Sequence, residues 1–235
     1  MTIPEPSCAH APNGQTKRRQ RTHQAFLDAA AQLLAEGRTS ASIEEITRRT
    51  GVGFGTFYNH FDTKEQLFEE SVLGLLDSYA TWLRNVTADL HDPAEAFARS
   101  FRLTGRLAAR RPDLFAPILN TGTEVMFMER GLRHAALADI RTGIATGRFV
   151  DEDPEILLVA AGGALLGLVR LISSGTLPDP DRATDALATR LLCLLGLTAT
   201  DAHALTQLPL PPTPDLHWND HTASHSPTVE DLAGT

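Results

Sequence analysis

The chain has 235 residues, 42% of them hydrophobic, which is enough to bury a substantial core in one domain or in two unequal ones. Its formal net charge of −8, taken as a sum, argues against a nucleic-acid partner, because phosphates repel an acidic surface. The two cysteines exclude a disulfide framework, and residues 1–16 lack the apolar core of a signal peptide, so a reducing, cytoplasmic compartment is expected.

The first two predicted helices have clear ends. One spans about residues 22–36, with Thr22 as its N-cap and Gly37 as its C-terminal stop. The next begins after Ser42, where SIEE forms a capping box, and ends at Gly51. Both carry apolar residues at helical spacing, so we expect them to pack together.

Residues 50–61, TGVGFGTFYNHF, allow two interpretations. Glycine-rich loops hold nucleotide phosphates, and GVGFG has some of that pattern. A dinucleotide or kinase loop follows a strand, however, whereas the residues before Gly51 form a capped helix. The GxGxxG pattern also fails at Thr56, and no P-loop lysine follows. The segment therefore favours a GVG turn and a short second helix, FGTFYNHF, as in a helix-turn-helix.

Helical spacing continues through most of the remaining chain. A long helix over about residues 64–90 begins with Thr63 as its N-cap. Further helices are expected from Asp92, near Pro112, and over residues 123–146, 153–175 and 181–197. Strand-like alternation is missing from the sequence, so the predicted fold class is all-α. From residue 199 onward prolines, histidines and threonines replace the apolar rhythm, which predicts a disordered tail.

The charges are unevenly distributed along the chain. Residues 15–64 hold eight lysines and arginines against five acidic residues, so the acidic excess lies in the rest of the sequence. A basic N-terminal block on an acidic body is typical of a small DNA-binding domain joined to a domain of another function.

Three features together resemble the TetR family of bacterial transcriptional regulators: FLDAAAQLLAEG, SIEEITRRTGVGFGTFYNHFDTKEQLF and the helical remainder. The match is specific over about residues 22–72 and is one of architecture beyond Leu73. The resemblance implies a homodimer, an N-terminal helix-turn-helix that binds double-stranded operator DNA, and a helical C-terminal domain that binds a small-molecule effector. It also implies that the effector releases the DNA, so we expect a repressor.

These expectations divide the chain into four parts. They are a disordered arm (1–16), the helix-turn-helix domain (17–63), an effector-binding and dimerisation domain (64–198) and a disordered tail (199–235). Dimerisation is expected through the helices over 153–175 and 181–197, because their near-uniform apolarity exceeds what one buried face needs.

The short helix after the GVG turn is the expected DNA reader. Thr56 offers a hydroxyl and a methyl to a base edge, and Asn59 can pair with adenine through two hydrogen bonds. Tyr58, His60 and Lys64 resemble the family's phosphate contacts. The full set of predicted DNA-binding residues is Arg18, Arg19, Arg21, Phe54, Gly55, Thr56, Tyr58, Asn59, His60 and Lys64.

Two positions in this reader depart from the family's pattern. Gly53 replaces the usual small hydroxyl residue at the helix start, which implies weaker capping, and Phe54 replaces a polar residue, which suits a T-rich contact. Phe57 and Phe61, four residues apart, are expected in the core. The basic cluster KRRQR over residues 17–21 fits either an arm that reaches DNA or a solvated run of charge.

The effector site is expected among inward-facing residues of the helices after Lys64. Aromatic and methionine side chains at helical spacing fit a plain core as well as a pocket, because pockets between bundle helices use core residues. Their composition predicts an apolar or aromatic small molecule. The candidates are Leu75, Tyr79, Trp82, Phe97, Phe101, Phe115, Met126 and His134, with Arg102 and Arg106 as polar anchors.

Other functions have little support in the sequence. GxSxG, HExxH and CxxC motifs are missing from it, and most acidic residues lie at helix starts, where capping explains them. We therefore predict no catalytic residue, cofactor or metal site. The apolar run over residues 156–169 is shorter than the roughly 18 residues of a membrane span, so no membrane partner is expected. The alternative function is a small-molecule carrier or enzyme that uses this helical fold without binding DNA.

Overall fold

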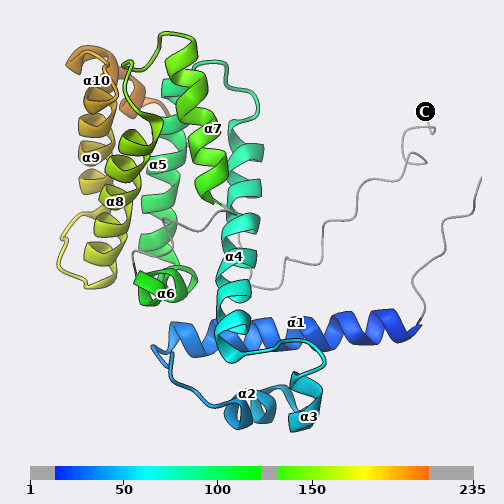
Figure 1. Cartoon of the computed structure of the whole chain (residues 1–235). Helices are drawn as coiled ribbons and strands as arrows, with labels where there is room; N and C mark the ends of the chain where they lie inside the picture. Colours follow the sequence, from blue (N-terminus) through cyan, green and yellow to red (C-terminus); the bar gives the residue numbers. More distant parts are fainter. Residues whose placement is uncertain (1–13, 123–131, 212–235) are drawn as a thin grey trace, which may run out of the picture.

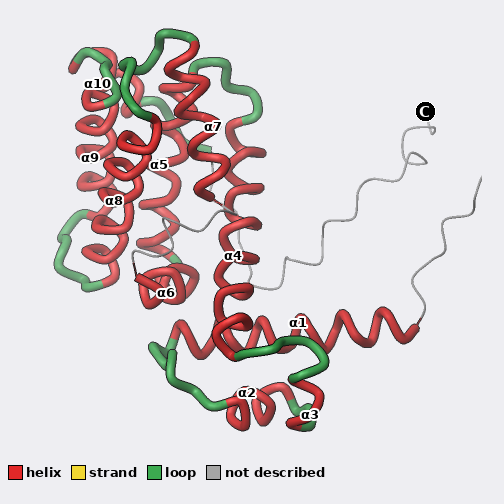
Figure 2. Tube along the Cα trace, viewed as in Figure 1, coloured by secondary structure: helices red, strands yellow, loops and turns green. Residues whose placement is uncertain are grey.

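The structure of the chain is a computed structural model that describes residues 14–122 and 132–211. Every regular element in these two ranges is a helix, which confirms the all-α prediction (Figure 2). The helices are α1 (Gly14–Ala35), α2 (Ile43–Thr50), α3 (Phe54–Phe57), α4 (Lys64–Thr87), α5 (Pro93–Arg110), α6 (Pro112–Thr121), α7 (Leu132–Ala145), α8 (Pro154–Ser173), α9 (Pro180–Leu194) and α10 (Ala199–Gln207).

The helices form a small N-terminal unit and a larger bundle (Figure 1). α1 lies across one end of the bundle, and α2 and α3 lie on the side of α1 that faces away from the bundle. α4 begins at this unit and runs along the bundle, where it packs against α5 and α7. α5 packs against α8 and α9 at the centre, and α10 covers α9 and α5. The two parts therefore meet where α1 packs against α4 and α6.

Side-chain caps fix several helix starts at the predicted residues. The Ser42 hydroxyl accepts a hydrogen bond from the backbone N–H of Glu45 at 3.3 Å, and the Thr63 hydroxyl accepts one from Gln66 at 3.1 Å. Asp92 caps α5 in the same way. Each bond satisfies a backbone donor that the first helical turn leaves without an internal partner.

The start of α1 differs from the prediction. α1 begins at Gly14, and Thr22 is not its N-cap: the Thr22 hydroxyl donates to the carbonyl of Arg18 at 3.1 Å, which is a bond of the helix interior. Glutamine, lysine and arginine are good helix formers, so the helix continues upstream. The basic cluster over residues 17–21 therefore lies on an exposed helical extension and not on a flexible arm.

The C-terminal boundary also differs. α10 lies inside the region predicted to be a disordered tail, and its residue Ala202 is fully buried. The Thr198 hydroxyl caps this helix by accepting from the backbone N–H of Asp201 at 3.1 Å. Of the helix predicted over residues 123–146, the structure describes the part from Leu132 onward, and residues 212–235 of the predicted tail lie outside the described ranges.

Candidate nucleic-acid interface and effector region

The predicted DNA reader is a turn and a single helical turn. Gly51 ends α2 with φ +69°, a left-handed conformation that favours glycine. Gly53 then begins α3 without a side-chain cap, as the sequence implies. α3 ends at Phe57, and residues 58–60 form a turn, so the second helix is shorter than the predicted 54–61.

Four aromatic side chains divide between the inside and the outside of this segment. On a helix continued to Phe61 they would share one face, but α3 ends after four residues and the chain turns at residues 58–60. Phe57 and Phe61 are 0% and 1% exposed in the core of the N-terminal unit, as predicted. Phe54 and Tyr58 are 47% and 52% exposed, with their rings edge to face at 5.6 Å.

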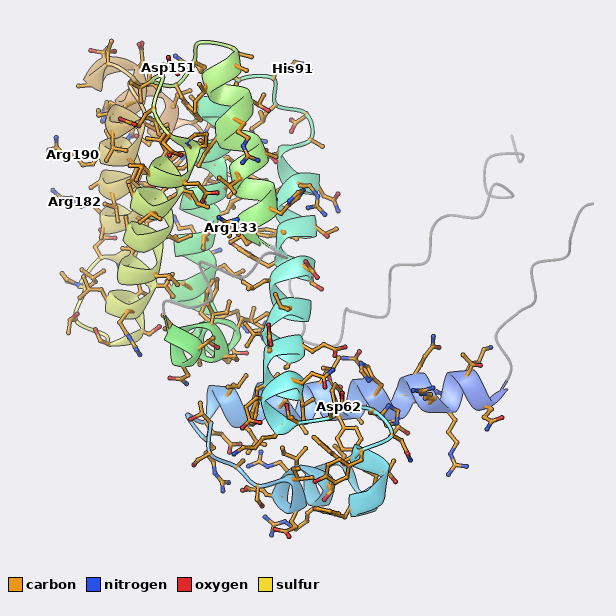
Figure 3. The ribbon with its side chains drawn as sticks, in the orientation of Figure 1. Asp62, His91, Arg133, Asp151, Arg182 and Arg190 are labelled. Carbon is orange, nitrogen blue, oxygen red and sulfur yellow. The ribbon has the colours of Figure 1, made fainter. Side chains whose placement is uncertain are left out.

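The structure brings most other predicted DNA residues to the same end of the molecule. Gly55 and Asn59 are exposed, and the Arg19 guanidinium donates to the Asn59 carbonyl at 3.3 Å. The remaining members of the set are Arg18 and Arg21, exposed on α1, and Thr56, His60 and Lys64, which are half-buried. The chain leaves this turn through Asp62 (Figure 3) and begins α4 at Lys64.

Lys64 lies at the first turn of α4, with its ammonium 3.4 Å from the carbonyl of Ala41 and 4.0 Å from a carboxylate oxygen of Glu65. Half-buried and at a helix N-terminus, it lies beside backbone N–H groups that also attract anions. The phosphate contact that the family resemblance implies for Lys64 stays a prediction.

Not all of the basic residues in the N-terminal block point to DNA. Arg49 binds Glu36 through two hydrogen bonds of 2.9 and 2.7 Å, and Arg38 binds Glu45 at 2.6 Å. The bond from Arg49 is the main reason that the pKa of the Glu36 carboxyl is lowered. These two arginines tie α2 to the end of α1. The net positive charge counted for this block is therefore larger than the charge that remains for contacts with phosphates.

His23 is a residue of this region that the sequence analysis missed. Its ring stacks on Phe61 at 4.8 Å, lies 5.7 Å from the ring of His60, and bonds Glu70 on α4 at 2.9 Å. Burial, His23 and Arg19 lower the pKa of His60. His23 and Glu70 are 47 positions apart, and helical periodicity carries no signal for a contact across that separation.

Most aromatic candidates for the effector region lie in one bundle cluster. Tyr79 lies edge-on to Phe115 at 5.9 Å and next to Trp82 at 5.5 Å. The buried hydroxyl of Tyr79 donates to the hydroxyl of Thr104, and burial raises the pKa of Tyr79. The members of the predicted set in this cluster are Leu75, Tyr79, Phe101 and Phe115, which are buried, and Trp82 and Phe97, which are half-buried.

The predicted polar anchors lie elsewhere. Arg102 is buried and donates to Asp185 on α9 at 2.8 Å and to the carbonyl of Leu208 at 2.7 Å. Arg106 donates to both oxygens of Asp185 at 2.8 Å. These arginines join α5 to α9 and α10, which is a structural role. His134 is exposed on α7, and Met126 lies outside the described residues.

A cavity of about 200 Å³ lies between α1 and α4, and its lining shares no residue with the Tyr79 cluster. It is lined by Gln24, Leu27, Asp28, Ala31, Ser71, Gly74 and Ser78. The cavity borders the joint between the N-terminal unit and the bundle, a place where the sequence predicted no pocket.

Within the described ranges, no group of three or more His, Cys, Asp or Glu side chains could hold a metal ion. One described helix, α8, is long and apolar enough to cross a membrane by length and composition. In the structure it is a bundle helix that packs against α5 and α7, but only 33% of its apolar window is buried. Part of its apolar surface is therefore uncovered in the single chain.

Comparisons with known proteins agree with this architecture. The family model "Bacterial regulatory proteins, tetR family" matches residues 26–71, and "Tetracyclin repressor-like, C-terminal domain" matches residues 92–207. The chain is 36% identical over 64 residues to the HTH-type transcriptional repressor KstR2 of Rhodococcus jostii (strain RHA1), and this match spans 27% of the chain and 31% of that protein.

Solved structures extend the likeness to the whole fold. The crystal structure of RolR in complex with its ligand resorcinol is 30% identical, covers 84% of this chain and 99% of its own, and has a TM-score of 0.69. A TetR-family regulator from Marinobacter aquaeolei VT8, at 20% identity, 79% and 97% coverage and a TM-score of 0.59, shares the fold. With both domains matched in order, the chain belongs to the TetR family of transcriptional regulators.

Proposed function

We propose that the protein is a homodimeric repressor that leaves its operator when a small aromatic or apolar molecule binds beside Tyr79. The observation that carries the proposal is the path of α4. This helix begins at Lys64 in the DNA-reading region and continues without a break to Tyr79 and Trp82 in the bundle (Figure 1). A ligand that displaces the bundle part of α4 would therefore move its DNA-proximal end.

Two bonds join α4 to α1 between these ends. The Ser71 hydroxyl donates to the carbonyl of Leu27 at 2.9 Å, and Glu70 bonds His23 at 2.9 Å. His23 in turn stacks on Phe61 at the end of the reading segment. A shift of α4 would thus be passed to α1 and to the reader, which changes the separation of the two readers in a dimer.

The chemistry of the Tyr79 cluster supports an aromatic ligand. The Tyr79 ring contacts the rings of Trp82 on α4 and Phe115 on α6, and its hydroxyl donates to Thr104. Rings beside hydroxyl groups are the combination that would bind a phenol through stacking and hydrogen bonds. The relative RolR binds resorcinol, a small hydroxylated aromatic compound. We therefore place hydroxylated aromatic molecules first among candidate effectors.

The apolar surface of α8 and α9 supports the homodimer. Ile156, Val159 and Leu171 on α8 and Leu194 on α9 are 45–60% exposed in the single chain. These helices lie on the side of the bundle away from α4 (Figure 1). Pairing this face with the same face of a second copy would bury it and set two readers at a fixed distance.

The effector site can be tested by removing one hydroxyl group. Resorcinol and other mono- and dihydroxybenzenes would be screened by native mass spectrometry, which also reports the dimer mass and any ligand that co-purifies. Tyr79→Phe should weaken the effect of the responding compound on operator release, because it removes a buried hydrogen-bonding group worth about 1–3 kcal/mol, or roughly 5- to 150-fold. Ligand-free operator affinity should stay within a few-fold, because the ring that packs in the core remains.

Asn85→Ala is the matched control, because Asn85 is exposed on the same helix. It should leave both the ligand response and DNA binding unchanged. If Tyr79→Phe and Trp82→Ala both leave the response intact while Gly74→Leu abolishes it, the effector binds in the cavity between α1 and α4 and the proposed site is wrong.

A further inference from the structure

Phe54 is an exposed aromatic residue on the surface proposed to read DNA. It is the first residue of α3 and is 47% exposed, while its neighbours in the core, Phe57 and Phe61, are fully covered. An exposed phenyl ring does not contribute the favourable free energy that its burial in a core would provide. Packing within the chain therefore does not explain Phe54, and its exposed ring suits an apolar partner.

The ring of Phe54 has one aromatic neighbour and open space beside it. Tyr58 lies edge-on to the ring at 5.6 Å. Glycines stand on both sides in the sequence, and a Cβ atom at Gly55 would meet no atom within 4 Å. A base edge could therefore approach the ring without meeting a neighbouring side chain.

A phenyl ring can neither donate nor accept a conventional hydrogen bond, so it can distinguish bases in the major groove through apolar contact. The apolar group that the groove displays is the 5-methyl of thymine. We propose that Phe54 is a specificity-determining residue that reads this methyl group in each half of the operator. The inference rests on the proposed function, since it requires α3 to enter the major groove.

Thr56 is the other residue that could contact the thymine methyl group, because it carries a methyl group on the same turn. Thr56 is half-buried, whereas Phe54 is 47% exposed, so the phenyl ring is the more accessible of the two apolar groups. Thr56→Ser removes this methyl and keeps the hydroxyl. It therefore distinguishes a methyl contact by Thr56 from one by Phe54 without removing a hydrogen-bonding group.

The test begins with duplexes selected from a random pool by the full-length wild-type protein. Each thymine of a selected duplex is then replaced in turn by uracil, which lacks only the 5-methyl group, and affinity is measured at fixed salt. One thymine in each half-site should be sensitive, with about a fourfold loss for one replacement and about 15-fold for both, from the burial of one methyl group per half-site. At the same position, 5-methylcytosine should bind more tightly than cytosine.

Phe54→Ala should bind the thymine and uracil duplexes equally, whereas Thr56→Ser should keep the wild-type preference. Because Phe54 is half exposed, its replacement should leave the helical circular dichroism and the dimer mass unchanged. Uracil tolerated at every position by the wild-type protein, or a preference retained in Phe54→Ala, would overturn the inference. Failure to select any duplex would instead contradict the proposed function itself.

Discussion

Replacing Tyr58 and Lys64 together with alanine should lower operator affinity by more than about 100-fold while the protein stays folded and dimeric. Tyr58 is 52% exposed, and Lys64 lies at the N-terminus of α4. The tyrosine hydroxyl and the lysine ammonium are both hydrogen-bond donors that suit phosphate oxygens. A hydrogen bond to a charged group contributes about 1.5–3 kcal/mol, and a dimer makes each contact twice. Fluorescence anisotropy with a selected duplex measures the loss.

Arg141→Ala supplies the control for loss of positive charge, because Arg141 is exposed on α7 in the bundle. It should change operator affinity by less than a few-fold. Lys64→Ala alone should also flatten the dependence of log affinity on log salt by about two for the dimer, one for each lost phosphate contact. An unchanged slope would remove Lys64 from the DNA surface.

Replacing Gly163 and Gly167 on α8 with leucine should convert the proposed dimer into monomers and abolish specific DNA binding. An added Cβ at either glycine meets no atom within 4 Å in the single chain, whereas one at Gly105 or Gly143 would collide with a side chain of the same bundle. The surface beside Gly163 and Gly167 is thus open in the single chain, where the proposed second copy would pack. Leucine there would hold two helices apart without crowding the monomer.

Analytical ultracentrifugation of the variant measures its mass in solution. The matched control is Ala138→Leu, which adds a similar side chain to the exposed side of α7 and should remain dimeric. Figure 3 shows Arg182 and Arg190 projecting outward from α9, and both are exposed. A soluble dimer of Gly163→Leu/Gly167→Leu with unchanged DNA affinity would place the interface on another face.

The features that the sequence predicted correctly are those that depend on neighbours along the chain. The caps at Ser42 and Thr63, the turn at Gly51 and the burial of Phe57 follow from spacings of three or four residues. The order of these motifs was also enough to predict the family.

Contacts between distant segments were beyond the reach of that reasoning. Arg102 has the composition of a ligand anchor, but its partner Asp185 lies 83 positions away and its role depends on how α5 and α9 pack. The bond between His23 and Glu70 crosses 47 positions for the same reason. The extension of α1 was missed because a run of basic residues fits both a helix and a flexible arm.

The stoichiometry and salt dependence of the complex with a selected duplex test the central claim most directly. The account predicts specific binding by two protomers or a multiple of two, with log affinity falling by about 0.9 for each phosphate contact per tenfold rise in salt. A complex of one protomer with one duplex, or an affinity that does not change with salt, would contradict it.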